Sequence, residues 1–327
     1  MRIELSEKLQ LLKDNYGTAK KEFRWDMAIS NHFIALSYAN KSKKIDTNRI
    51  KEVKEYIKSN TGVFSKFRGN NLSIMSSILS FEDDYESAFR EMEKLTVELK
   101  AQGISSYEYS PMIAYTFLKN SDYENREEKI KRAKYFYEDM KSKHMFLTAK
   151  DDYVYAALLG CTDLDLNETC KRIEYIYKTL NEMGYAKSNG LQTVSHIIAL
   201  GDDYDFRIKL FHKLAYELES LRVKIKSYNL SAAALMALVV NDTSEICNYV
   251  SEVYEDLKDS KGYKYSMPAY IKAMFSAMLV TSMYTNEEDK LSDISSGLSV
   301  QLIMVAQQQA MMAAIIASSA AASSSSS

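Results

Sequence analysis

Apolar positions follow two different patterns along the chain, and the two patterns alternate. In the first pattern, apolar residues recur at three- and four-residue spacing, as at Ile173, Ile176, Tyr177 and Leu180, which marks a helix with one buried face. In the second pattern nearly every residue is uncharged, as expected of a helix buried on all sides. Segments of the second pattern are 153–161, 191–200 and 231–240. The alternation predicts pairs of helices, each with a half-exposed and a fully buried member.

A short string recurs along the chain, in which Leu or Ile is followed four residues later by Asp. The five copies end at Asp83, Asp122, Asp163, Asp202 and Asp242, and successive copies lie 39 to 41 residues apart. So constant a spacing defines a repeat of about 40 residues that contains one pair of helices. The sequence therefore predicts an all-α fold, an α-solenoid-like array of about seven helix pairs with atypical pairs at its two ends.

The recurring aspartates are expected to cap helices rather than to bind metal ions. Asp83, Asp165 and Asp242 each stand three residues before a glutamate, which is the spacing of a capping box. Asp165 lies two residues beyond the repeat position, which suits a cap better than a ligand held at fixed geometry. We therefore predict that these carboxylates stabilise the N-termini of the half-exposed helices.

The end of the chain has a different composition from the repeats. No charged residue follows Asp293, and residues 298–317 are mainly apolar but are interrupted by glutamines at 301 and 307–309. Three interpretations stay open: a disordered tail with a transient helix, a helix that docks on the protein or mediates self-association, and a membrane anchor. We expect a single helical-repeat domain over residues 1–290 and an uncharged Ala/Ser-rich tail over 291–327.

Composition narrows the class of protein further. Apolar residues make up 46% and charged residues 26% of the 327 residues, which is typical of a globular protein, and the net charge of −2 gives no basic surplus for nucleic acid. Three widely spaced cysteines form no CxxC motif, and the charged N-terminus has no signal-peptide core. We expect a cytoplasmic protein without a metal ion or cofactor, which does not bind nucleic acid.

The turns that lead from the first to the second helix of each pair are the candidate site. In a regular solenoid they share one edge with the N-termini of the second helices, whose free N–H groups attract anions. Two of these turns contain Phe-Arg, at 23–24 and 67–68, and another contains Asp-Asp at 151–152. Either the Phe packs inward and the Arg is solvated, or the turns form a binding ridge. The candidate ligand- or partner-binding residues are Arg24, Arg68, Asn70, Asp151 and Asp152.

Several strings in the chain resemble one family of bacterial proteins. They are FRW at 23–25, NTGVFSKFRGN at 60–70, FLT at 146–148, DDY at 151–153, AALL at 156–159, LQTVSH at 191–196 and AMLV at 277–280. Over about residues 5–285 the chain resembles the domain-of-unknown-function family numbered four thousand and three, found mainly in low-GC Gram-positive bacteria. The resemblance implies a bacterial cytosolic protein, and it implies no activity and no catalytic residue.

These observations favour a non-enzymatic helical-repeat protein that binds a protein partner or itself. No phosphate loop, nucleophile elbow or metalloprotease motif is present. One alternative is an enzyme or small-ligand-binding protein with a site on the edge formed by the turns at 67–71 and 146–153. The other is membrane association through the C-terminal tail.

Overall fold

The computed structural model describes residues 2–225, 229–285, 306, 308 and 310–312. Residues 2–225 and 229–285 form fourteen α-helices, and no strand is found among the described residues, so the predicted all-α class is confirmed. In chain order the helices are α1 (Ile3–Glu22), α2 (Ala28–Asn40), α3 (Thr47–Asn60), α4 (Asn70–Leu79), α5 (Tyr85–Ala101), α6 (Ser110–Asn120), α7 (Arg126–Lys143), α8 (Asp152–Gly160), α9 (Leu166–Glu182), α10 (Asn189–Ile198), α11 (Tyr204–Ser220), α12 (Leu230–Val239), α13 (Ser244–Asp259) and α14 (Ala269–Tyr284).

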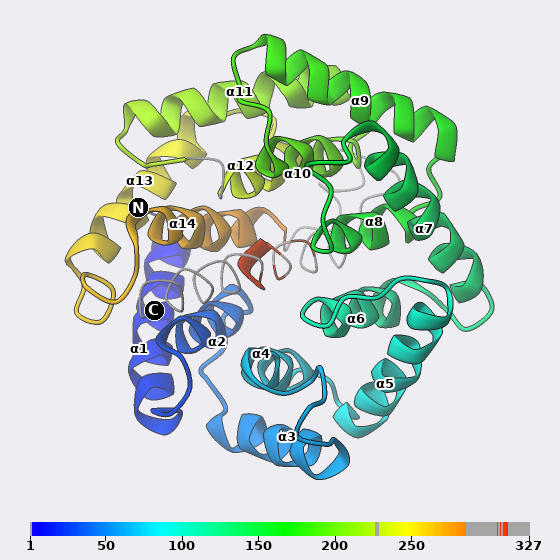
Figure 1. The fold of residues 1–327 in the computed structure, drawn as a ribbon. Coiled ribbons are helices and arrows are strands. Elements are labelled where there is room, and N and C mark those ends of the chain that lie inside the picture. The colour runs from blue at the N-terminus through cyan, green and yellow to red at the C-terminus, as the bar shows by residue number, and fades with distance from the viewer. Residues whose placement is uncertain (1, 226–228, 286–305, 307, 309, 313–327) are drawn as a thin grey trace, which may run out of the picture.

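The helices are arranged as a closed ring (Figure 1). The odd-numbered helices lie on the outside and the even-numbered helices lie nearer the centre. Each outer helix packs against the inner helix that follows it, and α14 contacts both α1 and α2. The first and last pairs are therefore neighbours, whereas an open array would leave them at opposite ends.

Polar and aromatic contacts join the two ends of the chain where the ring closes. The Nζ of Lys13 in α1 lies 3.0 Å from the Oδ1 of Asp256 in α13. The imidazole of His32 in α2 stacks on Tyr16 with ring centroids 3.7 Å apart, and its Nε2 lies 3.0 Å from the Oγ of Ser266. Burial lowers the pKa of His32 to about 3, so this contact is made by a neutral ring at physiological pH.

The two hydrophobic patterns correspond to the outer and inner helices. Helix α12 is buried at every position, and α9 buries the predicted stripe of Ile173, Ile176, Tyr177 and Leu180. Inner helices have neighbours on all sides, so a charged side chain there would be desolvated, which is costly. Outer helices face solvent along one side, which explains why their charged residues are retained.

Arginines on four of the outer helices form hydrogen bonds that hold each outer helix to the inner helix of its pair. Each guanidinium donates to backbone carbonyls at the end of the inner helix or in the turn that follows it, where carbonyl groups lack partners within the helix. These contacts run from Arg49 to Glu82 O and Asp83 O, from Arg132 to Leu164 O, from Arg172 to Ala199 O and Gly201 O, and from Arg207 to Ala237 O and Val240 O.

Aspartates cap several outer helices, but only one of the three predicted capping positions is confirmed. Asp242 accepts from the N–H groups of Thr243 and Ser244 at 2.7 and 3.5 Å, and not from that of Glu245. Asp165 accepts a hydrogen bond from the N–H of Glu168 at 2.9 Å, which confirms that cap. The predicted cap at Asp83 is wrong, because α5 begins at Tyr85 and the neighbouring Asp84 accepts from the N–H of Ser87. The recurring string thus marks the turn before the helix, and the cap follows within it.

Five described residues of the tail lie in the centre of the ring (Figure 1). Ala306, Gln308, Ala310, Met311 and Met312 are helical and buried, and the four apolar ones belong to the main hydrophobic core. At about 100° per residue these positions point to all sides of a helix, so the ring encloses the segment. Most of the tail predicted over 291–327 lies outside the described residues. No helix in the described ranges has the length and apolarity needed to cross a membrane.

Candidate binding edge

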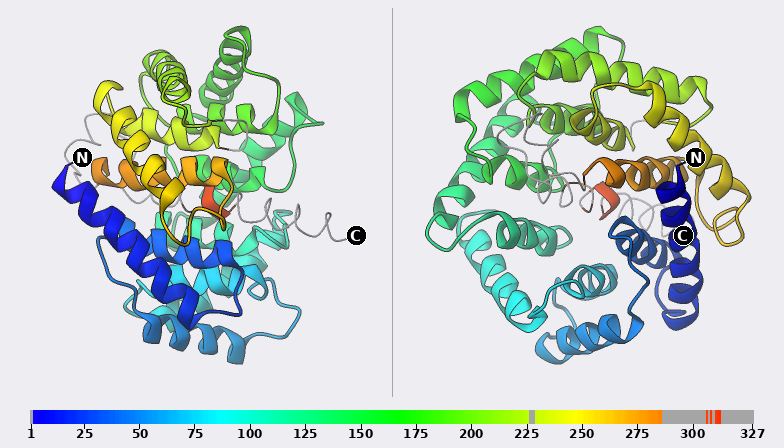
Figure 2. Two further views of the ribbon diagram at one scale, coloured as in Figure 1. Left: turned by 90° about the vertical axis from the view of Figure 1, so that its left-hand side faces the viewer. Right: turned by 180° about the vertical axis from the view of Figure 1, so that it is seen from behind.

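The turns that precede the inner helices form one edge of the ring, which we call the first edge (Figure 2). Neighbouring turns on it are linked: the hydroxyl of Tyr107 donates to the carbonyl oxygens of Phe64 and Ser65 at 3.0 and 3.1 Å. The first edge comprises residues 23–27, 61–69, 102–109, 144–151, 183–188, 221–225, 229 and 260–268. The turns that precede the outer helices form the second edge, residues 41–46, 80–84, 121–125, 161–165, 199–203 and 240–243.

Buried asparagines at the start of the inner helices hold the first edge together. The side-chain amide of Asn71 donates to Lys66 O in its own turn at 2.8 Å and to Glu108 O in the next turn at 2.9 Å. In the sixth pair, Asn229 likewise donates to Lys224 O in its own turn, and its second contact is to Tyr270 O in the first turn of α14. These bonds satisfy turn carbonyls and fix the spacing of adjacent pairs. The predicted candidate Asn70 is half-buried at the first position of α4.

The two Phe-Arg dipeptides have different environments. Arg68 donates to Lys58 O at 2.5 Å, to Thr61 O at 2.6 Å and to the hydroxyl of Thr61 at 2.9 Å, so it caps the C-terminus of α3. Arg24 is exposed, and its guanidinium carbon lies 5.0 Å from the ring centroid of Trp25. Only Arg24 is therefore presented to solvent as a binding residue.

Asp151 and Asp152 lie together at the start of α8. Asp152 has no exposed surface, and its Oδ2 accepts from the N–H of Ala149 at 2.8 Å, while its Oδ1 has no partner among the described residues. Burial, followed by the charge of Asp151, raises the pKa of Asp152 to about 8, so this carboxyl is largely protonated at neutral pH. Asp151 is half-buried and accepts from the amide of Asn189 in α10 at 2.9 Å. The structure brings these two candidates together and places Arg68 and Asn70 two helix pairs away.

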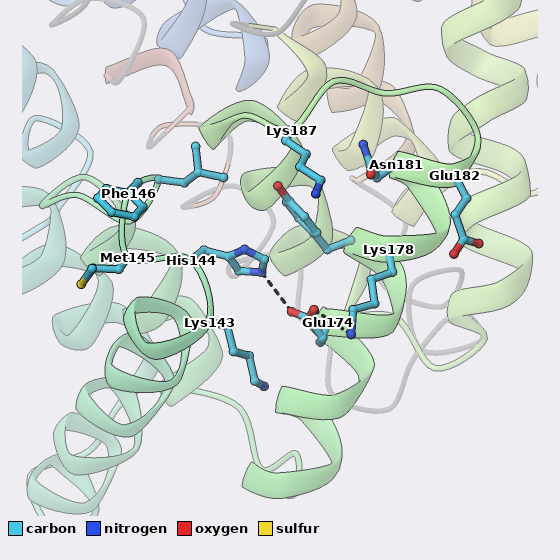
Figure 3. Close-up of a pocket in the computed structure, with 11 residues that line it drawn as sticks. Lys143, His144, Met145, Phe146, Glu174, Lys178, Asn181, Glu182 and Lys187 are labelled. Carbon is cyan, nitrogen blue, oxygen red and sulfur yellow. Dashed lines mark hydrogen bonds and ion pairs between the residues drawn. The ribbon is translucent and has the colours of Figure 1, made fainter.

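A pocket of about 390 Å³ opens beside the same turn, between it and α9 (Figure 3). On its wall the Nε2 of His144 lies 2.9 Å from the Oε2 of Glu174, whose other oxygen lies 3.1 Å from the Nζ of Lys178. The hydroxyl of Tyr177 is buried in the lining without a hydrogen-bond partner among the described residues, and Lys187 also lines the pocket. The lining thus contains three lysines, Lys143, Lys178 and Lys187, and two glutamates, Glu174 and Glu182.

Large apolar side chains project into solvent from the first edge. Phe146 is 95% exposed, Tyr265 92%, Phe64 89% and Trp25 87%, and each belongs to a different turn. Further exposed apolar residues of this edge are Met27, Val63, Tyr107, Met145 and Met183. On the second edge Tyr123 alone is comparable among the described residues. Exposed apolar groups are therefore concentrated on one side of the ring.

Charge is also divided between the two edges, although the whole chain is nearly neutral. The described first edge has nine basic residues, namely Arg24, Lys66, Arg68, Lys150, Lys187, Arg222, Lys224, Lys261 and Lys264. Its acidic residues are three: Asp26, Glu108 and Asp151. The second edge has the opposite balance, with three basic and eleven acidic residues. Helix capping by residues such as Asp84 and Asp165 accounts for part of the negative charge of the second edge. Arg68 is a first-edge cation with a capping role, and capping does not account for the rest of the positive charge there.

The described residues contain no group of three or more His, Cys, Asp or Glu side chains that could hold a metal ion.

Comparisons with known proteins show one family match and one relative. Residues 15–309 match the family described as "Protein of unknown function (DUF4003)". The chain is 24% identical over 312 residues to a protein of Bacillus subtilis (strain 168) described as "Uncharacterized protein YeaA", which covers 93% of this chain and 92% of that protein. No solved structure matches the chain. The family match continues past residue 285 and includes positions 306 and 308 in the centre of the ring.

Proposed function

The chain belongs to the DUF4003 family, and we propose that it is a non-enzymatic docking protein that binds an acidic partner surface through its first edge. One observation carries the proposal: four aromatic side chains that are almost fully exposed share an edge with nine basic and three acidic residues. Aromatic side chains are enriched at the interaction surfaces of proteins. The surrounding positive charge supplies long-range attraction to an acidic partner.

The proposal includes the origin of the ring. We infer that its helix pairs are copies of one α-solenoid-like repeat, closed on itself. Asn31, Asn71 and Asn229 at the inner-helix starts, all of which donate to turn carbonyls, support this inference. A ring of repeats presents the equivalent turn of every pair on one edge, so a feature of one turn recurs around the edge.

A second candidate is a small anionic ligand bound in the pocket beside Phe146. The ammonium group of Lys187 lines this pocket on an exposed side chain, and it can donate to a carboxylate or phosphate. A catalytic role for Asp152 has less support, because the side chain has no surface that a substrate could touch.

Site-directed photo-cross-linking in bacterial cells tests the docking function. A photoreactive benzoylphenylalanine replaces Phe64 or Phe146 on the first edge, and Tyr123 on the second edge is the matched control because it is also highly exposed. We expect adducts from positions 64 and 146 that the paired substitution Lys150→Glu with Lys187→Glu removes. Equal adducts from position 123, or none from the first edge, would contradict the proposal.

A further inference from the structure

We infer that the acidic partner is the headgroup surface of an anionic phospholipid membrane, an inference that rests on the proposed docking function. The exposed residues of the first edge are of the types that anchor proteins at a bilayer interface: aromatic rings with methionine and valine, surrounded by lysine and arginine. Aromatic rings lie at the level of the headgroups, and the cations meet lipid phosphates.

The distribution of the apolar side chains fits a membrane better than a folded partner. Tyr265, Trp25 and Phe64 extend from the turns of three neighbouring helix pairs, before α14, α2 and α4, and Phe146 extends from the turn before α8, so each ring belongs to a separate turn. A protein interface needs a continuous patch of about 800 Å² per partner. In a fluid bilayer each tip inserts independently, and no continuous patch is required.

Basic and aromatic groups are also paired within single turns. The guanidinium of Arg24 lies over the ring of Trp25, and the Nζ of Lys264 lies 5.7 Å from the ring centroid of Tyr265. Each of these two rings thus has a cation beside it. When the ring lies at the headgroup level of a bilayer, the cation lies close to the lipid phosphates. Lys66 and Lys150 follow Phe64 and Phe146 by a few residues in their turns.

Single-stranded nucleic acid would also attract cations and aromatic rings, but the arrangement suits it poorly. Bases stack on aromatic residues placed in succession along a groove. Here the rings belong to separate turns, and the adjacent Val63 and Met145 have no ring on which a base could stack. Aliphatic side chains contribute instead to insertion at the acyl boundary.

The second edge gives the ring an orientation. Its eleven acidic residues would be repelled by an anionic membrane, whereas the first edge would be attracted to it. Only the approach with the first edge facing the lipid is therefore favourable. Because these charges are exposed, the attraction is screened by salt within a Debye length of about 8 Å at physiological ionic strength.

Vesicle sedimentation with the full chain tests the inference. We expect the protein to sediment with vesicles of phosphatidylglycerol and phosphatidylcholine and to stay in solution with phosphatidylcholine alone. Phe64→Ala combined with Phe146→Ala should weaken binding about tenfold or more, and Tyr123→Ala should leave it unchanged. Circular dichroism confirms that each variant is folded.

Charge reversal provides an independent arm with a matched control. Lys150→Glu combined with Lys187→Glu on the first edge should weaken vesicle binding at least about thirtyfold. Lys43→Glu combined with Lys44→Glu makes the same change of charge on the second edge, and there we expect no loss of binding. An equal loss from both pairs would show that net charge alone is responsible and would overturn the inference.

The remaining outcomes separate the membrane from the docking edge. Suppose that the protein fails to bind anionic vesicles but its first edge cross-links to a protein or binds a single-stranded oligonucleotide. This result would overturn the membrane inference and support the proposed docking function. Failure to bind vesicles without any first-edge cross-link would overturn both.

Discussion

Replacing Asp152 by asparagine should stabilise the protein at alkaline pH and leave its stability unchanged in acid. In the folded protein, burial and then the charge of Asp151 raise the pKa of Asp152 from 3.8 to about 8. In the unfolded chain the carboxyl ionises near its ordinary pKa of about 4. Between these two values the folded state binds one more proton than the unfolded state, so the free energy of unfolding falls as the pH rises from about 4 to about 8.

The magnitude follows from the size of the pKa difference. Each unit corresponds to about 1.4 kcal/mol, so a difference of about four units means that Asp152 lowers the free energy of unfolding by roughly 5 kcal/mol by the time the pH reaches about 8. An asparagine cannot ionise, and its carbonyl oxygen can still accept from the N–H of Ala149, which Asp152 binds at 2.8 Å. Asp152→Asn should therefore be more stable than the wild type by about this amount at pH 8.5 and equal to it near pH 4.

The assay is guanidinium unfolding followed by circular dichroism across this pH range. The difference in unfolding free energy between wild type and Asp152→Asn isolates the one carboxyl from all other titrating groups. Asp151→Asn is the control, because it leaves the buried carboxyl in place and should keep most of the wild-type pH dependence. A difference between wild type and Asp152→Asn that stays constant from pH 4 to 8.5 would refute the reasoning.

Three further predictions concern packing, and denaturant unfolding measures each. Arg68→Ala should lower the unfolding free energy by about 1.5–3 kcal/mol, because it removes the cap of α3. An unchanged unfolding free energy would contradict the capping role and make Arg68 a candidate binding residue again. Gly160→Ala should lower the unfolding free energy by about 2–3 kcal/mol, because a Cβ there would lie 2.7 Å from atoms of α7. The control Gly17→Ala has open space around it and should leave the unfolding free energy unchanged or raise it. Met311→Arg should lower the unfolding free energy by at least about 3 kcal/mol if the ring encloses the tail. The control Val97→Arg, at an exposed position, should lower it by no more than about 0.5 kcal/mol. Equal effects of the two substitutions would place the tail outside the core.

The helices could be predicted from the sequence because their signals are local. The stripe through Ile173 and Leu180, the uncharged inner helices and the cap at Asp165 each depend on residues within one or two turns of helix. Closure of the ring could not be predicted in the same way. It depends on contacts such as Lys13 with Asp256, whose partners are separated by 243 residues and follow no local pattern.

The candidate site was predictable in position and only partly in its residues. The sequence places the Phe-Arg turns and the Asp151 turn on one edge, but it does not distinguish Arg24, which faces solvent, from Arg68, which caps α3. The longer turn at 61–69 brings the second arginine back onto the end of its helix. The exposed ring of Phe146 was missed, because a phenylalanine in a turn is usually expected to pack inward. The useful signal is the recurrence of aromatic and basic residues together in separate turns.

Emission from Trp25 tests the central claim most directly, because it is the single tryptophan of the chain and lies 87% exposed on the first edge. On titration with vesicles of phosphatidylglycerol and phosphatidylcholine, insertion of this edge should shift the emission to shorter wavelength. The shift should weaken at high salt and be absent from vesicles of phosphatidylcholine alone. Emission that stays at its solvent-exposed wavelength at every concentration of anionic vesicles would contradict docking of the first edge on a membrane.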